Sequence, residues 1–376
     1  MFEVMPGTEN NLGKLNMFVF GKISEDKILG NFIHCYTGYA KDEKIRHESS
    51  SGGTVTALLI YLLESKQIDG ALVTRMSSQD PLKPEVFLAK TKKEILEAKG
   101  SKYAPAPLNI GIKRLEKEKG KFAVVGLPCH IEGIRKIQLL KPELRKKIVL
   151  CLGLVCAKTV NFTGTEMLLK LYGIKKEEVK KISYRGNGWP GKLKIVTEKK
   201  EIERDYFDYF SFFNQGFFVP SCCFLCSDFA NELADISFAD AWVADFIKRD
   251  KEGTNIIITR TKKGEELLQK TKKSIYFEQI NPERVKKITG FLIKKTNKSF
   301  LRPLSIIFNS YWPLKQDKSE VKTSFFLKVS LFSQYFNSLI TEKFPDFFLK
   351  LPKSFWTFQN WTNKKIYTIY KKVIKK

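Results

Sequence analysis

The stretch Lys121-Phe122-Ala123-Val124-Val125-Gly126-Leu127-Pro128-Cys129-His130 places a short apolar run directly before a glycine turn. We predict a buried strand here, because strands covered on both faces carry apolar side chains throughout. A helix is predicted to follow, from Ile131 to about Leu139. In α/β sheets, ligands bind where a strand ends in such a loop. The stretch therefore predicts an α/β fold with a ligand-binding loop at Gly126, Pro128 and Cys129.

A second strand repeats this plan further along the chain. Residues 147–156 form an apolar run that ends in Cys156. More apolar segments, separated by helical stretches, lie at 31–40, 69–74 and 234–242. Alternation of strands and helices is typical of layered α/β folds. Residues up to about Gly30 show no clear period, and we expect a strand and a loop there.

The chain has 376 residues, 43% of them hydrophobic, which allows two domains with packed cores. Its first residues lack the basic start and apolar run of a signal peptide. No uncharged apolar run approaches the roughly 18 residues of a membrane-spanning helix. We therefore expect a cytoplasmic protein. Its seven cysteines would remain reduced there and would serve a metal site, catalysis or packing.

The net charge of +26 would suit nucleic acid, but no helix-turn-helix spacing, zinc finger or ribonucleoprotein motif is found. We predict no nucleic-acid partner; acidic cofactors, an acidic redox partner or an anionic membrane fit better. Residues 298–376 carry 15 lysines and arginines against four acidic residues, interleaved with aromatics. Such a segment can lie on a membrane surface. Helices packed on the body, with solvated lysines, explain it equally well.

Three of the seven cysteines fall within Cys222-Cys223-Phe224-Leu225-Cys226. The Cys-x-x-Cys pair of Cys223 and Cys226 lets two thiolates reach one centre. Cys222 could replace Cys223 in this pair. Structural zinc usually uses two such close pairs in a small module.

The other candidate ligands, Cys129 and Cys156, come singly, each after a predicted strand. Such scattered thiolates favour an iron–sulfur cluster, with burial as small apolar residues as the alternative. Cys35 and Cys151 lie inside apolar strands and are expected to be core residues. A nucleophilic pair of Cys129 and His130 is disfavoured, because adjacent residues at a helix start rarely face each other.

A serine–glycine loop, Ser50-Ser51-Gly52-Gly53-Thr54, runs into an apolar stretch that continues to Glu64. Glycines let a ligand approach the backbone, and the N–H groups of a first helical turn attract phosphate. An ordinary capped helix gives the same pattern, so both interpretations stay open. A second glycine-rich turn, Arg185-Gly186-Asn187-Gly188-Trp189-Pro190-Gly191, joins two predicted strands and carries groups that could sit against a planar ring.

Taken in order, these motifs resemble the coenzyme F420 hydrogenase/dehydrogenase beta-subunit family. The resemblance covers about Cys35 to about Lys295. It rests on seven segments: Ser50–Leu59 with Asp69–Val73, Gly100–Tyr103, Gly126–Cys129, Leu152–Cys156, Arg185–Gly191, Cys223–Asp228 and Asp235–Trp242.

The resemblance implies a flavin-bearing iron–sulfur oxidoreductase that binds FAD and one [4Fe-4S] cluster and exchanges a hydride with coenzyme F420. Flavins handle hydride transfer and clusters pass single electrons, and no catalytic acid or base is assigned. The implied cluster ligands are Cys129, Cys156, Cys223 and Cys226. The implied cofactor contacts are Ser51, Gly52, Gly53, Thr54, Ser101, Lys102, Tyr103, Gly126, Pro128, Asn187, Gly188, Trp189 and Lys192.

The family pattern also implies a mixed α+β body in two layered parts. A flavin-binding region at 31–120 and a cluster-bearing region at 121–295 would precede a basic helical extension at 296–376. The implied partner is ferredoxin or a hydrogenase/dehydrogenase subunit, and peripheral membrane contact would fall on residues 298–376.

This sequence departs from the family at His130, where members often have Gln, at Ala239, where they often have Gly, and in lacking N-terminal ferredoxin cysteines. The electron donor and acceptor therefore stay open. Two rival functions remain. One is a flavin/iron–sulfur reductase of a small organic substrate, in a setting of polysaccharide synthesis. The other is a zinc-stabilised binding protein whose tail meets a membrane or nucleic acid.

Overall fold

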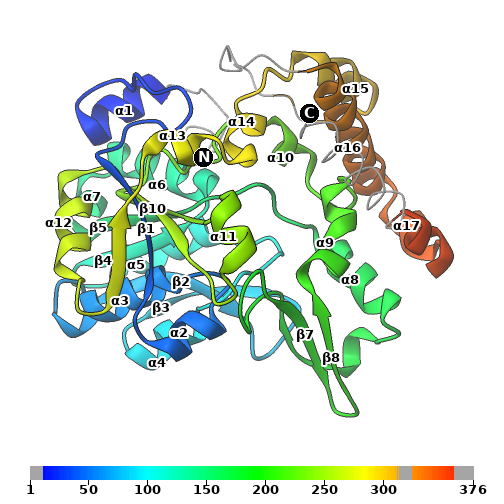
Figure 1. Ribbon diagram of the computed structural model, residues 1–376, viewed down its shortest axis with the longest axis horizontal. Helices are drawn as coiled ribbons and strands as arrows, with labels where there is room; N and C mark the ends of the chain where they lie inside the picture. Colours follow the sequence, from blue (N-terminus) through cyan, green and yellow to red (C-terminus); the bar gives the residue numbers. More distant parts are fainter. Residues whose placement is uncertain (1–11, 311, 313–323, 360–376) are drawn as a thin grey trace.

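The computed structural model describes residues 12–310, 312 and 324–359, and an eight-stranded sheet forms its centre (Figure 1). The strand order is β11-β1-β10-β9-β5-β4-β2-β3. The strands are β1 (His34–Ala40), β2 (Gly70–Met76), β3 (Pro84–Ala89), β4 (Phe122–Gly126), β5 (Ile148–Leu154), β9 (Ile236–Asp240), β10 (Asn255–Thr259) and β11 (Ile275–Gln279). The predicted mixed α/β class is confirmed.

The middle of this sheet is parallel. Strands β2, β4, β5 and β9 pair in parallel, and β1 runs the same way as β9 because β10 is antiparallel to both. The carboxyl ends of these five strands therefore lie at one edge of the sheet, which we call the carboxyl edge. Both faces of β4 and β5 are covered, which explains their continuous apolar sequence.

Helices cover both faces of the sheet, and two short helices, α2 (Glu43–Glu48) and α11 (Ala244–Arg249), follow β1 and β9 at the carboxyl edge. One face packs on α3 (Thr54–Glu64), α4 (Lys92–Glu97) and α12 (Lys262–Lys270). The other face packs on α1 (Leu12–Phe20), α5 (Ile112–Lys117), α6 (Pro128–Leu140), α7 (Pro142–Lys147), α13 (Pro282–Lys286) and α14 (Thr289–Lys294).

The expectation of a strand and a loop before Gly30 was wrong for α1. Leu15 and Val19, one helical turn apart, pack against the core on the α6 side of the sheet. This short helix carries apolar residues on more than one side, so its period is hidden in the sequence.

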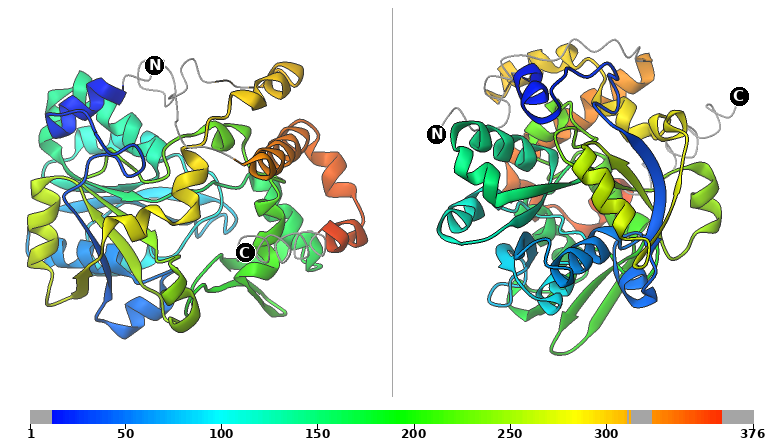
Figure 2. Two further views of the ribbon diagram at one scale, coloured as in Figure 1. Left: turned by 45° about the horizontal axis from the view of Figure 1, so that its top comes forward. Right: turned by 90° about the vertical axis from the view of Figure 1, so that its left-hand side faces the viewer.

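A second part of the molecule, which we call the helical lobe, lies beside the large sheet (Figures 1 and 2). Its three-stranded antiparallel sheet contains β6 (Val179–Ser183), β7 (Lys192–Thr197) and β8 (Glu201–Asp205). Its helices are α8 (Phe162–Leu171), α9 (Tyr206–Asn214), α10 (Ser221–Leu225), α15 (Arg302–Ile307), α16 (Phe325–Lys343) and α17 (Pro345–Lys350).

The C-terminal extension helps to build the lobe's core. Trp356 is buried, and its ring lies 5.3 Å from that of Phe217 and 5.7 Å from that of Phe218. Tyr335 and Leu339 of α16 are buried in the same cluster. The interpretation of the extension as helices packed on the body therefore holds for the face of α16 that carries Tyr335 and Leu339.

The predicted boundary between residues 120 and 121 falls within one continuous sheet. Strands β1 to β3 precede this boundary and the other five strands follow it, and β2 pairs directly with β4. Among the described residues, no helix is long and apolar enough to span a membrane.

Candidate functional site

Two neighbouring strands bring Cys129 and Cys156 to the carboxyl edge. β4 ends at Gly126 and β5 at Leu154, and each cysteine follows within three residues. The buried Asn231 amide donates to the Gly126 carbonyl at 2.8 Å and to the Leu154 carbonyl at 3.1 Å. This bridge fixes the two strand ends relative to each other, and with them the starting points of both cysteine loops.

Helix α6 begins at Pro128, so Cys129 and His130 lie in its first turn. The Leu127 N–H donates to His130 Nδ1 at 3.3 Å. Burial lowers the pKa of His130 to about 4, opposed by a hydrogen bond to the Ala106 backbone. Backbone groups thus engage the neutral imidazole, which supports the prediction that Cys129 and His130 form no nucleophilic pair.

The Cys-x-x-Cys pair lies on α10 and the residue that ends it. Cys223 is on the helix, and Cys226 follows directly, with its N–H donating to the Cys222 carbonyl at 3.1 Å. The Cys226 thiol donates to the Asp228 carbonyl at 3.5 Å. Both cysteines are partly buried.

The four predicted cluster ligands come within electrostatic reach of one another. Burial raises the pKa of Cys129 to about 12, and the charges of Cys226 and Cys223 add to the rise. Burial also raises the pKa of Cys156, again with contributions from Cys223, Cys129 and Cys226. We call these four residues the thiol site. The structure thus brings together cysteines that are up to 97 positions apart, from 129 to 226.

Cys222 and Cys223 differ in environment. Cys222 is exposed, and its thiol donates a hydrogen bond to Cys223. This bond lowers the pKa of Cys223 to about 6 against the effect of burial, with help from the charge of Lys294. The same bond raises the pKa of Cys222.

Two buried lysines that the sequence did not single out support the thiol site. The Lys294 ammonium donates to the Cys223 carbonyl at 2.5 Å, and Lys298 donates to the Cys226 carbonyl at 3.0 Å. Their residues are only 7% and 4% exposed. A lysine is almost never this buried without a partner, so both cations belong to the site. Nothing in a lysine-rich sequence distinguishes them from surface lysines.

In the part of the chain that the structure describes, no three His, Cys, Asp or Glu side chains are arranged to hold a single metal ion. Among the described residues, the cysteines are therefore not at the spacing of a tetrahedral zinc site, in which sulfur ligands lie about 2.3 Å from the ion. A [4Fe-4S] cluster takes four cysteines, each through a different iron, and so accepts thiols spaced further apart. The donor set, four cysteines beside buried cations, fits such a cluster.

The serine–glycine loop is held by polar contacts at the carboxyl edge. Ser51 Oγ donates to the Thr254 carbonyl at 2.8 Å, and Thr54 Oγ1 donates to Asn255 Oδ1 at 2.8 Å. Gly53 has φ of +71° and is the N-cap of α3, and the Thr54 N–H donates to Asn255 Oδ1 at 3.4 Å. The first turn of α3 presents N–H groups of the kind that favour an anion.

The loop from Ser101 to Tyr103 contacts the serine–glycine loop through Ser101. The Ser101 N–H donates to Ser50 Oγ at 2.7 Å. The Lys102 ammonium donates to the carbonyls of Ala98, Lys99 and Gly100, and burial lowers its pKa to about 7. The ring of Tyr103 packs 4.7 Å from Phe210 and 5.8 Å from Tyr184 in the helical lobe.

The glycine-rich turn after β6 is anchored by Arg185. Its guanidinium forms a 2.8 Å ion pair with Asp240 at the end of β9 and donates to the Ser50 carbonyl at 2.6 Å and the Pro190 carbonyl at 2.8 Å. This pair is buried. Asp240 raises the pKa of Arg185, overcoming the desolvation that would lower it. Arg185 thus ties the helical lobe to the serine–glycine loop and the large sheet.

The tip of this turn docks on the body through its backbone. The Gly188 N–H donates to the His47 carbonyl at 3.0 Å, and the Trp189 N–H donates to the Lys251 carbonyl at 2.6 Å. Asn187 and Gly188 have positive φ. The Trp189 ring lies 4.6 Å from that of Trp242, just after β9. Lys192, at the start of β7, is exposed and forms a 3.6 Å ion pair with Glu203.

The predicted residues therefore gather in two groups at the carboxyl edge. Gly126 and Pro128 belong with the thiol site. The other group, which we call the glycine junction, comprises residues 50–54, 100–101 and 185–191. The Lys102 side chain contacts its own turn, the Tyr103 ring contacts the helical lobe, and Lys192 pairs with Glu203. Arg185, Asn231, Lys294 and Lys298 hold the two groups in place but were not among the predicted site residues.

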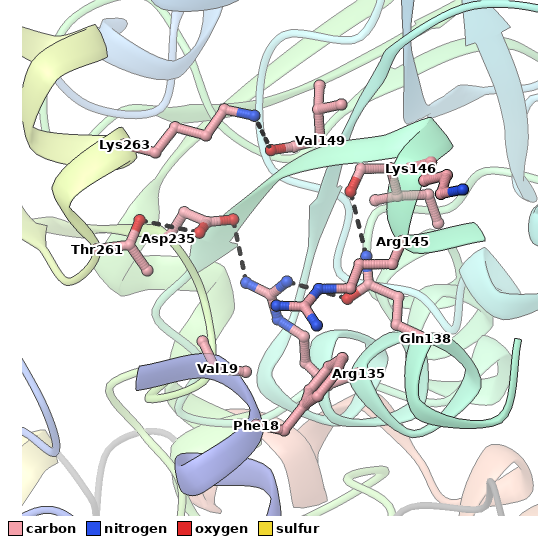
Figure 3. A pocket seen from close by; sticks show the side chains of 11 residues that line it. Phe18, Val19, Arg135, Gln138, Arg145, Lys146, Val149, Asp235, Thr261 and Lys263 are labelled. Carbon is pink, nitrogen blue, oxygen red and sulfur yellow. Dashed lines mark hydrogen bonds and ion pairs between the residues drawn. The ribbon is translucent and has the colours of Figure 1, made fainter. Parts of the chain in front are cut away.

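A separate pocket of about 400 Å³ lies at the opposite edge of the sheet, where β5 and β9 begin (Figure 3). Arg135 crosses it and donates to Asp235 Oδ2 and Gln138 Oε1, both at 3.0 Å. Lys263 donates to the Val149 carbonyl at 2.7 Å. None of the predicted site residues lines this pocket.

The fold and the carboxyl edge define a cofactor-binding α/β protein with glycine loops and clustered thiols, as in cofactor-dependent oxidoreductases. The chain belongs to the coenzyme F420 hydrogenase/dehydrogenase beta-subunit family. Residues 35–113 match the family's N-terminal region and residues 119–285 its C-terminal region. The family recognised from the sequence motifs is thereby confirmed, and with it the class of F420-linked oxidoreductases.

Two curated relatives illustrate the similarity. The chain is 32% identical to the coenzyme F420-dependent sulfite reductase of Methanocaldococcus jannaschii, over 73% of this chain and 42% of that protein. It is 28% identical to the coenzyme F420 hydrogenase subunit beta of Methanosarcina barkeri, over 70% of this chain and 86% of that subunit. The chain thus spans less than half of the sulfite reductase but most of the hydrogenase subunit.

A solved structure shares the fold. A chain of the F420-reducing [NiFe] hydrogenase complex from Methanosarcina barkeri superposes with a TM-score of 0.58 at 22% sequence identity. The match covers 76% of this chain and 97% of that chain. The family match ends at residue 285, so the C-terminal extension lies outside it.

Proposed function

We propose that this chain passes electrons between coenzyme F420 and a one-electron partner, using FAD and one [4Fe-4S] cluster. One observation carries the proposal: cysteines from three separate segments come within electrostatic reach of one another, and two of these segments begin at neighbouring strand ends of the carboxyl edge. Membership of an F420-linked family supports the substrate. The carboxyl edge is also where α/β sheets bind their ligands.

Cys129, Cys156, Cys223 and Cys226 would hold the cluster. The positive charges of Lys294 and Lys298 would offset the negative charge of four coordinated thiolates. The hydrogen bonds from these two lysines to the Cys223 and Cys226 carbonyls also stabilise the backbone of the Cys-x-x-Cys turn.

FAD would lie at the glycine junction. The first turn of α3 would face its phosphates, with Ser51, Gly52, Gly53 and Thr54 shaping the approach. Ser101 would help to hold the FAD, Asn187, Gly188 and Trp189 would lie near the flavin or F420 ring, and Gly126 and Pro128 stay predicted cofactor contacts. Lys102, Tyr103 and Lys192 stay predicted contacts. Bound flavin would supply hydride chemistry, and the cluster would supply one-electron steps.

The partner we propose is ferredoxin or a hydrogenase/dehydrogenase subunit, in the cytoplasm, where thiols stay reduced. The strongly basic chain suits acidic partners and the anionic tail of F420. The similarity to a named hydrogenase subunit supports a partner chain. We propose no nucleic-acid partner.

Anaerobic purification and reconstitution with iron, sulfide and FAD tests this proposal. We expect a brown protein with iron and flavin that reduces or oxidises F420 when a one-electron partner is supplied. Stoichiometric zinc without flavin would instead support the zinc-stabilised binding protein. A loaded enzyme that leaves F420 unchanged but reduces an organic acceptor would support the small-substrate reductase.

A further inference from the structure

A cleft opens at the outer side of the thiol site. It has a volume of about 600 Å³ and lies between α10, the residues after α15, and the end of α16. The exposed Cys222, which neighbours Cys223 in the chain, lines it. The cleft is therefore a place where the thiol site comes close to the surface. Its lining residues are Ser221, Cys222, Phe308, Asn309, Ser310, Leu339, Glu342 and Lys343.

An apolar stripe along α16 leads into this cleft. Phe325, Val329, Phe332 and Phe336 are 75%, 51%, 43% and 40% exposed. Their spacings of four, three and four residues place them on one face of the helix. Continuing by three and four residues reaches Leu339 and Lys343, which line the cleft.

Helix α15 widens this apolar surface. Ile306 and Ile307 are exposed, and Phe308 directly after α15 packs 5.9 Å from Phe336 of α16. Among the described residues, ten of the 18 exposed large hydrophobic side chains lie from Ile306 onward. A contiguous apolar patch of this kind usually marks an interaction site.

The exposed stripe is not a sign of a loosely attached helix. The other side of α16 is buried in the lobe, where Tyr335 and Leu331 pack and Ser338 Oγ donates to the Val219 carbonyl at 2.7 Å. Thr341 also accepts from the Phe218 N–H at 2.9 Å. The helix is therefore fixed, and its outer face is available to a partner.

Charge indicates the kind of partner. Lys343 lines the cleft and Lys328 lies on the same helix. The one acidic residue lining the cleft, Glu342, accepts from the Ser221 N–H at 3.1 Å. The extension at 298–376 carries 15 basic against four acidic residues. A partner with an acidic rim around an apolar contact would match this surface.

We propose that the α16 stripe, residues 306–308 and the Cys222 cleft form the docking surface for a small acidic one-electron carrier protein of the ferredoxin type. This inference rests on the proposed function. Oxidation of one reduced F420 releases two electrons and two protons, and two oxidised carriers each accept one electron. Apart from Ser221 and Cys222, the residues of this surface lie beyond the family match, which ends at residue 285.

The test measures F420-dependent reduction of an acidic [4Fe-4S] ferredoxin by the reconstituted holoenzyme. The variants are a Phe332→Ser, Phe336→Ser double substitution and Lys343→Glu. The controls are Ile110→Ser and Lys93→Glu, which change a more exposed apolar residue and an exposed basic residue elsewhere. Reduction of a small viologen dye, which needs no docking, is measured in parallel, and direct binding of ferredoxin is measured by fluorescence anisotropy.

We expect the docking variants to raise the KM for ferredoxin and its Kd at least about tenfold, because central interface residues dominate affinity. Iron content, flavin content and dye reduction should stay at wild-type levels, and the controls should match wild type. Unchanged ferredoxin binding with intact dye reduction would overturn the docking surface while leaving the proposed function standing. A wild-type protein without iron and flavin would overturn the proposed function itself.

A membrane is the competing occupant of this face, and flotation with phosphatidylglycerol vesicles decides between the two. Wild-type flotation that the double substitution abolishes, combined with unchanged ferredoxin binding, would assign the face to a membrane and overturn the proposal. Weaker ferredoxin binding by the variants, with no flotation of the wild type, would support it.

Discussion

The glycine junction and the thiol site share one edge of the sheet but satisfy their polar groups in different ways. At the junction, Ser51, Thr54 and Arg185 all bond to protein groups. At the thiol site, Cys129 is exposed and Cys156 is partly buried, and desolvation and neighbouring cysteines raise both pKa values. The junction is thus held by hydrogen bonds within the protein. The thiol site instead gathers thiols whose deprotonated form a bound metal would stabilise.

This difference assigns the two regions different tasks. A preorganised junction can fix the orientation of a large cofactor without rearrangement. Clustered thiols can hold a metal cluster, because metal binding favours their deprotonated form. Substitutions at the junction should therefore affect folding, whereas substitutions at the thiol site should affect metal content.

The largest expected effect is at the thiol site. Cys226→Ala should remove the cluster, because it deletes one of four ligands. Iron analysis and visible absorbance after anaerobic reconstitution check this. Cys35→Ala, which changes a buried cysteine of β1, should retain the iron. Cys222→Ala should also retain it. Iron at the wild-type level in Cys226→Ala would show that the ligand set is wrong.

At the junction, Arg185→Met should destabilise the fold by about 3 kcal/mol, because it removes a buried guanidinium and leaves the partly buried Asp240 without its partner. Urea denaturation of the apoprotein measures the loss. Arg75→Met, whose ion pairs with Glu85 and Glu97 are more exposed, is the control and should cost about 1 kcal/mol or less. Equal losses in both variants would contradict the view of the junction as the tie between lobe and sheet.

A pH effect should come from Glu232, next to Asn231. Burial raises the pKa of Glu232 to about 6, although Lys295 opposes the rise. A carboxyl whose pKa is higher in the folded state binds its proton more tightly there, so stability falls as pH rises from about 4.5 to about 6. The fall should be about 2 kcal/mol.

Denaturation at a series of pH values measures this fall, and Glu232→Gln should flatten the profile across that window. The exposed Glu64→Gln should keep the wild-type slope. An unchanged slope in Glu232→Gln would assign the pH dependence to other groups.

The smallest expected effect concerns the rim of the junction. Lys192→Ala should change stability by less than about 1 kcal/mol, because its ion pair with Glu203 is exposed. If Lys192 meets the anionic tail of F420, the KM for F420 should rise while kcat stays constant. An unchanged KM would remove Lys192 from the predicted contacts.

The sequence predicted most of the sheet, because β4 and β5 are continuous apolar runs that end in loops with cysteines. It also identified Cys35 and Cys151 as core residues, and both are fully buried. It assigned α1 wrongly, where a short apolar segment fits either a strand or a helix.

The residues that organise the site were harder to find. In the sequence, Lys298 cannot be distinguished from a surface lysine. In the structure, its ammonium donates a hydrogen bond to the Cys226 carbonyl. Asn231 lies over 70 residues from both strand ends that it joins, at separations of 105 and 77 positions. Such roles depend on contacts between distant segments, which a single sequence does not reveal.

The burial of Trp356 has a consequence for how this protein can change over evolutionary time. The family match ends at residue 285, yet Trp356 fills the interior of the helical lobe against Phe212, Phe217 and Phe218. A segment that fills the interior of a domain cannot be removed or exchanged without leaving a cavity there. Changes in the extension and in the helical lobe should therefore be coupled.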